Sequence, residues 1–309
     1  MFKAFRRPIL APKVAAGAGA DARGGMSDSF DLILPRRRTT PAIFASPHSG
    51  RVYTREFLRR TVLTPDRLRS SEDAFIDRLF GTAPDAGAPL LLAQVPRAWI
   101  DLNRAPDEFD PALIAGVRRG PHNPRIASGL GVVPRVVAGG RSIYRGKITL
   151  DEARGRVRDV WRPYHATLRQ LVDETLAGFG RAILIDCHSM PHEALEGLGP
   201  RGARPDVVLG DRFGKAASAE VMDAVEAAFV GAGLRVGRNA PFAGAYTAQH
   251  YGRPEQGSHV VQVEIDRALY MDETRIAPLP GFDAFAAAMA GIVADIAAIG
   301  APGMRLAAE

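Results

Sequence analysis

Two histidines in this 309-residue chain directly follow short apolar segments. His48 lies in the sequence SPHSG after a strand predicted over Ala42–Ser46, and His188 follows a strand predicted over Ala182–Cys187. Ligands of an α/β sheet bind outside the carboxyl ends of its strands, so both imidazoles are expected at one edge of the sheet. Neutral imidazole is a common metal ligand. The pair therefore predicts a metal site, although either histidine taken alone better fits an ordinary loop hydrogen bond.

A third metal ligand is expected from an acidic residue, because catalytic zinc commonly has three protein ligands and leaves one position for water. Glu72 and Asp73 open a helix predicted over Glu72–Phe80, and either carboxylate can turn back toward the metal. The alternative for both acids is a structural role at the positive end of the helix dipole. Strand alternation also places Asp186 on the same face as His188, where its carboxylate is a candidate partner for a ligating imidazole.

The segment RAWIDLNR holds residues suited to binding and polarising a substrate. We predict a strand over Ala98–Leu102, and alternation along it places these side chains on one face: Arg97, Trp99, Asp101 and Asn103. Arg104 leaves the end of the strand. Its guanidinium suits a bidentate contact with a carboxylate, to which Asn103 adds a further hydrogen bond. A surface salt bridge is the alternative role for Arg104.

A further carboxylate lies in an apolar strand predicted over His259–Ile265. Alternation separates the apolar side chains of this strand from three polar ones on the opposite face: Gln262, Glu264 and Asp266. Burying a carboxylate among valines is unfavourable unless it has partners, so Glu264 is a functional candidate. Beside a metal it is suited to act as a general base and then as the acid for a leaving amine.

Short apolar runs alternate with longer segments of helical periodicity, which predicts a single α/β domain from about residue 29. The expected fold class is a mixed, mostly parallel sheet with helices on both faces. The remaining predicted strands are Leu90–Val95, Asp206–Leu209 and Leu234–Gly237. The remaining predicted helices are Leu150–Phe179, Ala216–Gly231 and Phe282–Ile299. The segment Arg118–Arg145 is rich in Gly, Pro and Arg, and we expect it to form a long, functional surface loop.

The composition favours a globular protein over several other classes. Apolar residues make up 46% of the chain and charged residues 24%, and a single cysteine, Cys187, excludes an internal disulfide. The Ala-rich segment 284–298 comes nearest to a membrane span but is interrupted by Asp295, so no membrane span is predicted. We therefore expect a cytoplasmic protein without a disulfide scaffold.

The excess basic charge is concentrated at the N-terminus. The pI is near 9.8, but residues 1–25 carry five basic residues and one acid, which is +4 of the total net charge of +6. The rest of the chain has no long Lys/Arg run with interleaved aromatic residues, so we expect no nucleic-acid partner. We interpret residues 1–25 as a disordered extension or a mis-assigned start, with Met26 opening the functional domain 26–309. A targeting segment is the alternative.

Four motifs, in this order within residues 41–275, resemble those of N-formylglutamate amidohydrolases: SPHSG, RAWIDLNR, DCHSMP and GAYTAQHYGRPEQGSHVVQVEIDRALYMDE. That family is similar in fold and chemistry to zinc carboxypeptidases, which have the phosphorylase/hydrolase-like fold, and to aspartoacylase-like deacylases. The resemblance implies a site for Zn²⁺ or another divalent metal, with His48 and His188 as ligands. It further implies that Asn103 and Arg104 clamp the substrate carboxylate and that Glu264 activates water.

Two departures from the wider group change the expected site. Zinc carboxypeptidases have an acid three residues after the first histidine, where this chain has Arg51. The acidic ligand must therefore come from elsewhere, and Asp73 fits the family pattern better than Glu72. The stretch around Gln249 also lacks a basic residue that the resemblance leads us to expect for binding a glutamate side chain. The side chain of the substrate is therefore left open.

The resemblance predicts hydrolysis of the amide bond of an N-acyl amino acid. The default substrate is N-formyl-L-glutamate, which yields formate and L-glutamate, as in histidine degradation. Tyr246, in the last motif, is expected to contact this substrate. Arg97 is a candidate for stabilising the developing oxyanion, given its charge and its predicted face. Two alternatives stay open: a deacylase or peptidase for another carboxylate-bearing amide, and a non-catalytic binder of the same fold.

Overall fold

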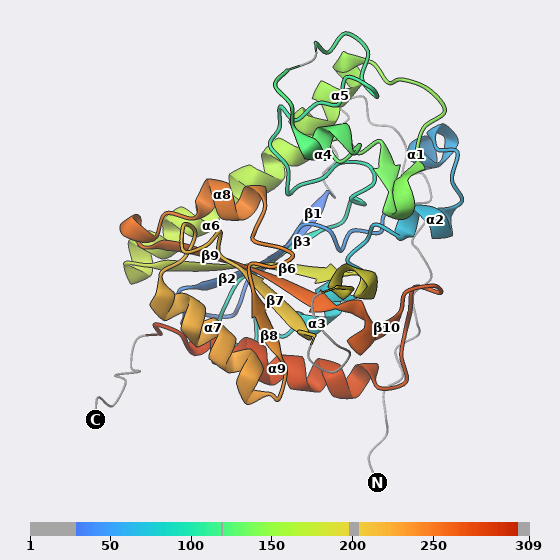
Figure 1. Ribbon diagram of the computed structural model, residues 1–309. Coiled ribbons are helices and arrows are strands. Elements are labelled where there is room, and N and C mark those ends of the chain that lie inside the picture. Colours follow the sequence, from blue (N-terminus) through green and yellow to red (C-terminus); the bar gives the residue numbers. More distant parts are fainter. Residues whose placement is uncertain (1–28, 119, 198–203, 302–309) are drawn as a thin grey trace, which may run out of the picture.

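The structure is a computed structural model that describes residues 29–118, 120–197 and 204–301. Within these residues seven strands form one sheet, in the order β1-β3-β2-β6-β9-β7-β8 (Figure 1). Their bounds are β1 Phe30–Ile33, β2 Ala42–Ser46, β3 Leu90–Ala93, β6 Ala182–Met190, β7 Val207–Gly210, β8 Val236–Arg238 and β9 Ser258–Asp266. Two small ribbons pair β4 Val136–Val137 with β5 Arg141–Ser142, and β10 Met271–Asp272 with β11 Ala277–Pro278.

The middle of the sheet is parallel and its flanks are mixed. β3, β2, β6 and β9 run parallel to one another, whereas β1 pairs antiparallel with β3 and β7 pairs antiparallel with β9. β8 continues the sheet parallel to β7. The predicted mixed, mostly parallel sheet is confirmed. Because β2, β6 and β9 are adjacent and parallel, their carboxyl ends meet at one edge, where polar groups of all three converge.

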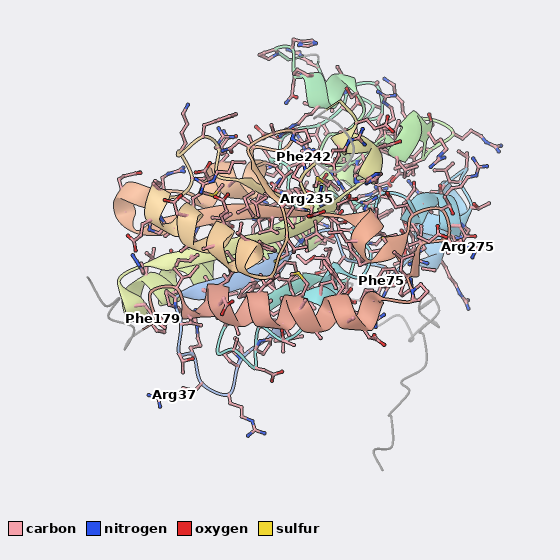
Figure 2. All side chains as sticks on the ribbon, turned by 60° about the horizontal axis from the view of Figure 1, so that its bottom comes forward. Arg37, Phe75, Phe179, Arg235, Phe242 and Arg275 are labelled. Carbon is pink, nitrogen blue, oxygen red and sulfur yellow. The ribbon has the colours of Figure 1, made fainter. Side chains whose placement is uncertain are left out.

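Helices cover both faces of the sheet, as predicted. Their bounds are α1 Arg55–Arg60, α2 Pro65–Arg69, α3 Ile76–Leu79, α4 Pro124–Ala127, α5 Leu150–Arg156, α6 Arg162–Phe179, α7 Ala219–Gly231, α8 Tyr246–Tyr251 and α9 Phe282–Ala298. One apolar core lies between the sheet and α3, α7 and α9, and a second lies between the opposite face and α5, α6 and α8 (Figure 1). Phe75, labelled in Figure 2, belongs to the first core and contacts Phe282 of α9, with ring centroids 5.8 Å apart.

The strand predicted over Ala98–Leu102 is wrong. The backbone turns there instead: the amide of Trp99 donates to the carbonyl of Pro96 at 2.9 Å, and the amide of Asp101 donates to the carbonyl of Val132 at 2.8 Å. Ile100 and Leu102 of this segment are buried in the second core, although the segment pairs with no strand there. Burial by a loop therefore produced the same sequence pattern as burial in a sheet.

The helix predicted over Glu72–Phe80 is much shorter than expected, because α3 begins only at Ile76. The preceding residues form a turn that tertiary contacts hold. The amide of Asp73 donates to the carbonyl of His48 at 3.0 Å, and Phe75 has a left-handed backbone with a φ of 68°. A left-handed residue cannot continue a right-handed helix, so Glu72 and Asp73 are not its first turn.

The helix predicted over Leu150–Phe179 has the correct limits but is interrupted. A wide turn of π type, Val157–Trp161, joins α5 to α6, and the amide of Arg162 donates to the carbonyl of Val157 five residues back. Pro163 follows this turn and has no amide hydrogen to donate to the next helical hydrogen bond, which accounts for the widening.

The other predicted elements agree with the structure to within a few residues, and β1 was not predicted. β1 is a four-residue strand at the edge of the sheet, and Asp31 interrupts its apolar residues. Within the part of the chain that the structure describes, no helix combines the length and apolarity needed to cross a membrane. The predicted N-terminal extension, residues 1–25, lies outside the described residues.

Candidate active site

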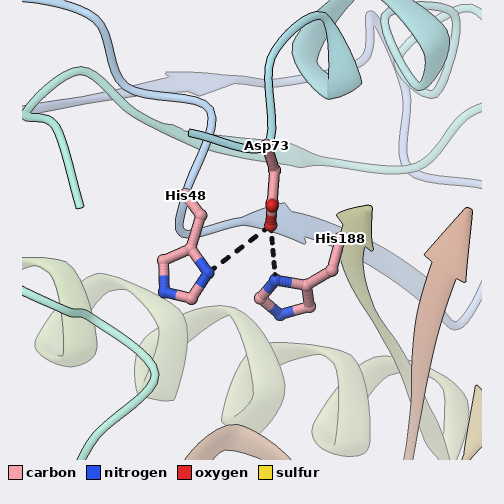
Figure 3. A group of neighbouring side chains, drawn as sticks. All are labelled: His48, Asp73 and His188. Carbon is pink, nitrogen blue, oxygen red and sulfur yellow. Dashed lines mark hydrogen bonds and ion pairs between the residues drawn. The ribbon is translucent and has the colours of Figure 1, made fainter. Parts of the chain in front are cut away.

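Three buried side chains converge at the carboxyl edge of the sheet: His48, Asp73 and His188 (Figure 3). His48 follows the end of β2, His188 lies near the end of β6, and Asp73 comes from the turn before α3. Direct pairing of β2 with β6 brings the two histidines together, with ring centroids 4.8 Å apart. One ligand atom from each of the three residues lies within 4.8 Å of the other two.

The carboxylate of Asp73 faces a ring nitrogen of each histidine. Its Oδ2 lies 2.9 Å from Nδ1 of His188 and 3.5 Å from Nδ1 of His48 (Figure 3). On the far side of His48, Nε2 lies 2.7 Å from Oδ1 of Asp101. Nε2 of His188 lies 3.1 Å from Oδ1 of Asp186, so the strand-face prediction for Asp186 leads to a real contact. Both imidazoles are thus held between an inner and an outer carboxylate.

This group fits a divalent metal ion. Nδ1 of His48 is buried and has no hydrogen-bond partner, while Nε2 of the same ring is engaged by Asp101. Donation of the Nε2 proton to Asp101 leaves a lone pair on Nδ1 that faces Asp73 and His188. Two imidazole nitrogens and one carboxylate oxygen are a donor set that catalytic zinc commonly uses. His48, Asp73 and His188 would therefore hold the metal.

The carboxylates around the two histidines favour a positive charge between them. Burial favours the neutral form of Asp73, but contacts with His188 and His48 outweigh burial and hold its pKa well below the usual value. Burial lowers the pKa of His188, but Asp186 and Asp73 outweigh it and hold that pKa well above the usual value. A proton on His188 therefore supplies positive charge between two carboxylates, which is the charge that a metal ion would supply there.

Asp73, and not Glu72, lies with the histidines. Oδ1 of Asp73 accepts from Arg267 at 3.1 Å and from the hydroxyl of Ser189 at 3.3 Å, so Oδ2 is left to face the imidazoles. Glu72 instead accepts from the hydroxyl of Tyr53 at 2.6 Å and pairs with Arg69. The turn before α3 therefore sends two consecutive carboxylates to different environments.

Sequence reasoning missed the contribution of Arg267. Arg267 lies directly after the carboxyl end of β9, is buried, and also donates to the carbonyl of Glu72 at 2.8 Å. It thereby holds both the backbone and the side chain of the turn that carries Asp73. The rule that strand ends carry site residues, which points to His48 and His188, points to Arg267 as well.

The turn over residues 96–104 brings Arg97, Asp101, Asn103 and Arg104 to the site without the predicted strand. Nε of Arg97 donates to Asp101 at 2.9 Å, which orients the carboxylate that contacts His48. Asn103 donates through Nδ2 to Asp186 at 2.9 Å and accepts at Oδ1 from the amide of Thr247 at 2.7 Å. Its amide is thus largely occupied within the protein, whereas the resemblance implied a contact with substrate.

Glu264 lies in β9, directly opposite His188 of β6 in the parallel register. Its Oε1 accepts from Nε2 of Gln262 at 2.9 Å, and Gln262 in turn accepts from the amide of Ala245. Burial raises the pKa of Glu264 to about 7, an effect that His188 opposes. A carboxyl group with a pKa near neutrality can both accept and return a proton, as the predicted general base requires.

A cavity of about 610 Å³ opens over this group of residues. Its lining includes the His–Asp–His group, Arg97, Asn103, Arg104, Gln262, Glu264 and Arg267. Its walls come partly from residues 125–140, so the long loop predicted over Arg118–Arg145 borders the site. A cavity of this size, with an apolar wall and a few convergent polar groups, has the features of a small-molecule site.

Two residues singled out from the last sequence motif lie away from this cavity. The ring of Tyr246 packs against Trp161 and His250 and is not part of the cavity lining, although its neighbours Gly244 and Ala245 are. Gln249 is also outside the lining. The expected substrate contact of Tyr246 therefore has no support in the arrangement of the cavity.

The fold and the site together define a class of protein. It is a single α/β domain that carries a buried His–Asp–His group beside a carboxyl group of raised pKa, in a cavity lined by arginines. This constellation is typical of hydrolases that cleave amide bonds.

Comparison with known proteins agrees with this class. Residues 40–271 match the sequence profile of the N-formylglutamate amidohydrolase family. The chain is 31% identical to an N-formylglutamate deformylase of Pseudomonas aeruginosa over 250 residues, which are 79% of this chain and 86% of the relative. It is also 31% identical to the Pseudomonas putida deformylase over 241 residues, 76% of this chain and 83% of that one.

A solved structure shows the same relationship. The chain resembles the crystal structure of an N-formylglutamate amidohydrolase from Ralstonia eutropha with a TM-score of 0.81 and 35% identity, over 87% of this chain and 97% of that one. A protein from Agrobacterium tumefaciens shares the fold at 16% identity, with a TM-score of 0.62. The chain belongs to the N-formylglutamate amidohydrolase family.

Proposed function

We propose that this protein is a metal-dependent hydrolase that cleaves N-formyl-L-glutamate into formate and L-glutamate. One observation carries the metal dependence: the buried Nδ1 of His48 has no hydrogen-bond partner and faces Asp73 and His188. A buried ring nitrogen without a hydrogen-bond partner is costly unless a ligand satisfies it. The substrate follows from family membership and from the deformylase names of the Pseudomonas relatives.

The residues of the cavity have complementary roles in this proposal. When bound, a divalent metal supplies polarisation of the scissile carbonyl and makes water a better nucleophile near neutral pH. Glu264 accepts the proton of the attacking water as the new carbon–oxygen bond forms. It returns that proton to the nitrogen as the carbon–nitrogen bond breaks, which gives formic acid and the amine. The acid proton of the formic acid then passes to the amine, so the products are formate and the ammonium form of L-glutamate. Arg97, which lines the cavity, stabilises the negative charge that develops on the formyl oxygen.

The first test measures metal content and formate release together. Wild-type protein loaded with zinc is expected to bind one metal ion per chain and to release formate from N-formyl-L-glutamate. His48→Ala and His188→Ala are each expected to lose the metal and the activity while remaining folded. His122→Ala, which changes an exposed histidine outside the cavity lining, serves as the control. Full metal occupancy in either site variant would contradict the assignment of the ligands.

The size of the cavity supports a second candidate function, hydrolysis of an amide with a larger acyl group. N-formylglutamate has only about a dozen non-hydrogen atoms, whereas cavities of 300–1,000 Å³ hold drug-sized ligands. A volume of about 610 Å³ therefore leaves room for another carboxylate-bearing amide with a larger acyl group. Rates for N-formyl-, N-acetyl- and N-peptidyl-L-glutamate separate the two functions. A preference for the larger acyl groups would favour the second.

A further inference from the structure

Four arginines line the cavity. Two of them form ion pairs with carboxylates of the described residues, and the other two do not. Arg97 forms an ion pair with Asp101 at 2.9 Å, and Arg267 forms one with Asp73 at 3.1 Å. Both carboxylates are buried, so each of these two guanidiniums has a buried carboxylate as its partner. The other two arginines of the cavity, Arg104 and Arg125, have a different environment.

Arg104 is buried but is held by backbone carbonyls and not by a carboxylate. Its Nε donates to the carbonyl of Leu130 at 3.0 Å, and its Nη1 donates to the carbonyl of Asn103 at 2.9 Å. Among the residues that the structure describes, it forms no ion pair within 4 Å. Carbonyl groups fix the position of the guanidinium without cancelling its charge, so that charge is available to an anion in the cavity.

Arg125 lies in α4 and reaches the same cavity from its exposed rim. Within the described ranges of the chain its side chain forms no hydrogen bond or ion pair. It is close enough to affect Arg104: burial lowers the pKa of Arg104, Asp101 opposes this, and Arg97 and Arg125 lower it further. Two neighbouring cations that face one cavity repel each other unless an anion lies between them.

One short segment sets the positions of both cations. The side chain of Asn123 caps α4 by accepting from the amide of Arg125 at 3.0 Å, and Leu130, five residues further, holds Arg104. An ion pair between Arg135 and Asp110 at 2.8 Å anchors the next part of the loop. Residues 123–135 thus form a braced wall that presents Arg125 beside Arg104.

We infer that Arg125 determines specificity by binding the side-chain carboxylate of a dicarboxylic N-acyl amino acid, while Arg104 binds the α-carboxylate. This inference rests on the proposed function. The α-carboxylate is one carbon from the scissile nitrogen, so it takes the cation nearer the histidines: Arg104 adjoins Asn103, whose Nδ2 lies 3.0 Å from Nε2 of His188. The side-chain carboxylate is two carbons further out and takes the cation at the rim.

The position around which the resemblance led us to expect a basic residue does not line the cavity. Gln249 lies outside the cavity lining, and its Oε1 accepts from Arg212 at 3.4 Å. The long loop therefore supplies the distal cation, and the last motif does not.

The test compares N-formyl-L-glutamate with N-formyl-L-glutamine, which has the same shape but no side-chain charge. Arg125→Gln is expected to lower kcat/KM for the glutamate substrate about 10- to 100-fold, mostly through KM, because it removes one charge-assisted contact. The value for the glutamine substrate is expected to stay within about twofold. Arg125→Lys, which keeps the charge, is expected to restore part of the loss. Arg118→Gln, an exposed arginine of the same segment outside the cavity lining, is the control.

Equilibrium binding separates this inference from the proposed reaction. Zinc-loaded wild-type protein is expected to bind L-glutamate more tightly than L-glutamine in calorimetry, and Arg125→Gln is expected to abolish the difference. Failure of wild-type protein to release formate, with this binding preference intact, would overturn the proposed reaction and not the role of Arg125. Equal affinity for the two amino acids, no binding of either, or an unchanged preference in Arg125→Gln would overturn the role of Arg125.

Discussion

At the scale of single residues, the carboxyl groups around the two site histidines have different neighbours and therefore different expected roles. Asp73 faces both imidazoles through one oxygen, while Asp101 and Asp186 contact the outer nitrogens. Glu264 contacts neither ring and accepts from Gln262. We therefore expect Asp73 to hold the metal, the two outer aspartates to orient the imidazoles, and Glu264 to transfer protons.

Glu264→Gln tests the proton-transfer role. Glutamine is close in shape but cannot accept a proton, so kcat is expected to fall by about 10²- to 10⁴-fold, the usual contribution of general acid–base catalysis. Metal content and KM should change little, because Glu264 is not placed as a ligand. Formate release and metal analysis on the same samples measure both. Loss of the metal would make Glu264 a ligand, and activity within a few-fold of wild type would place the base elsewhere.

Asp73→Asn and Glu72→Gln form a matched pair of substitutions in consecutive residues. The affinity for zinc is expected to fall by more than about 100-fold in Asp73→Asn, since loss of even an outer partner of a ligand costs about 10- to 100-fold. Glu72→Gln should keep wild-type affinity, because Glu72 bonds to Tyr53 and Arg69 away from the histidines. Competition with a chelator measures both affinities. The reverse ranking would assign the ligand to Glu72.

At the scale of elements, the connections that follow the parallel strands place the site. The connection after β2 carries His48 and packs tightly against the segment that follows β3: the amide of Val52 donates to the carbonyl of Gln94 at 2.9 Å. Gly50 lies at this crossing, and a Cβ added there would lie 1.9 Å from the carbonyl oxygen of Val95. The contact is between backbone atoms, so a larger residue at position 50 can be accommodated only if one of the two backbone segments shifts.

Gly50→Ala is therefore expected to displace the segment that carries His48. We expect a loss of about 1–3 kcal/mol in the free energy of unfolding, typical of overpacking, together with weaker zinc binding. Gly178→Ala in α6 is the control, because a Cβ there has no neighbour within 4 Å, and it should stabilise the protein by up to about 1 kcal/mol. Denaturant unfolding of both variants measures the difference. Equal free energies of unfolding for the two variants would show that the backbone at Gly50 accommodates a Cβ without cost.

At the scale of the whole molecule, stability is expected to depend on pH through a buried histidine outside the site. His165 of α6 lies at 2.8 Å from the carbonyl of Leu102 and at 2.9 Å from the hydroxyl of Tyr251. Burial lowers the pKa of His165 from 6.5 to about 4. The unfolded chain thus binds the proton more readily than the folded protein. The contribution of His165 to the free energy of unfolding is therefore fully present above pH 6.5 and is lost as the pH falls from about 6.5 toward 4.

The size of this loss is about 3 kcal/mol, the free energy equivalent of that change in pKa. His165→Gln can still donate and accept hydrogen bonds but does not titrate, so its free energy of unfolding should fall less steeply over this range. Chemical unfolding at several pH values checks the slope, with the exposed His122→Gln as a control. An identical slope in wild type and His165→Gln would rule out this source of acid sensitivity.

Removal of residues 1–25 is expected to leave metal content and formate release unchanged. The family match begins at residue 40, and the first strand of the sheet begins at Phe30. The removed segment carries most of the excess positive charge but none of the site residues. Assays of a protein that begins at Met26 test this expectation. Loss of the fold or of the activity would give the segment a structural role.

The sequence by itself determined the central sheet and the residues at its carboxyl edge. β2 and most of β6 are continuous apolar runs, and β9 alternates apolar with polar residues, so all three were predicted to within about three residues of their observed ends. Polar residues that interrupt or follow such runs are few, and for this reason His48, His188 and Glu264 stood out. Their pairing at one edge follows from parallel topology and needs no detail of packing.

Only the tertiary structure decided how loop residues join these strand ends. Glu72 and Asp73 are adjacent and chemically alike, and a left-handed turn held by the carbonyl of His48 and by Arg267 turns only Asp73 inward. Likewise, the segment around Asp101 has the alternation of a strand but is a buried turn. Such choices depend on contacts between segments far apart in the chain, and local periodicity carries no record of them.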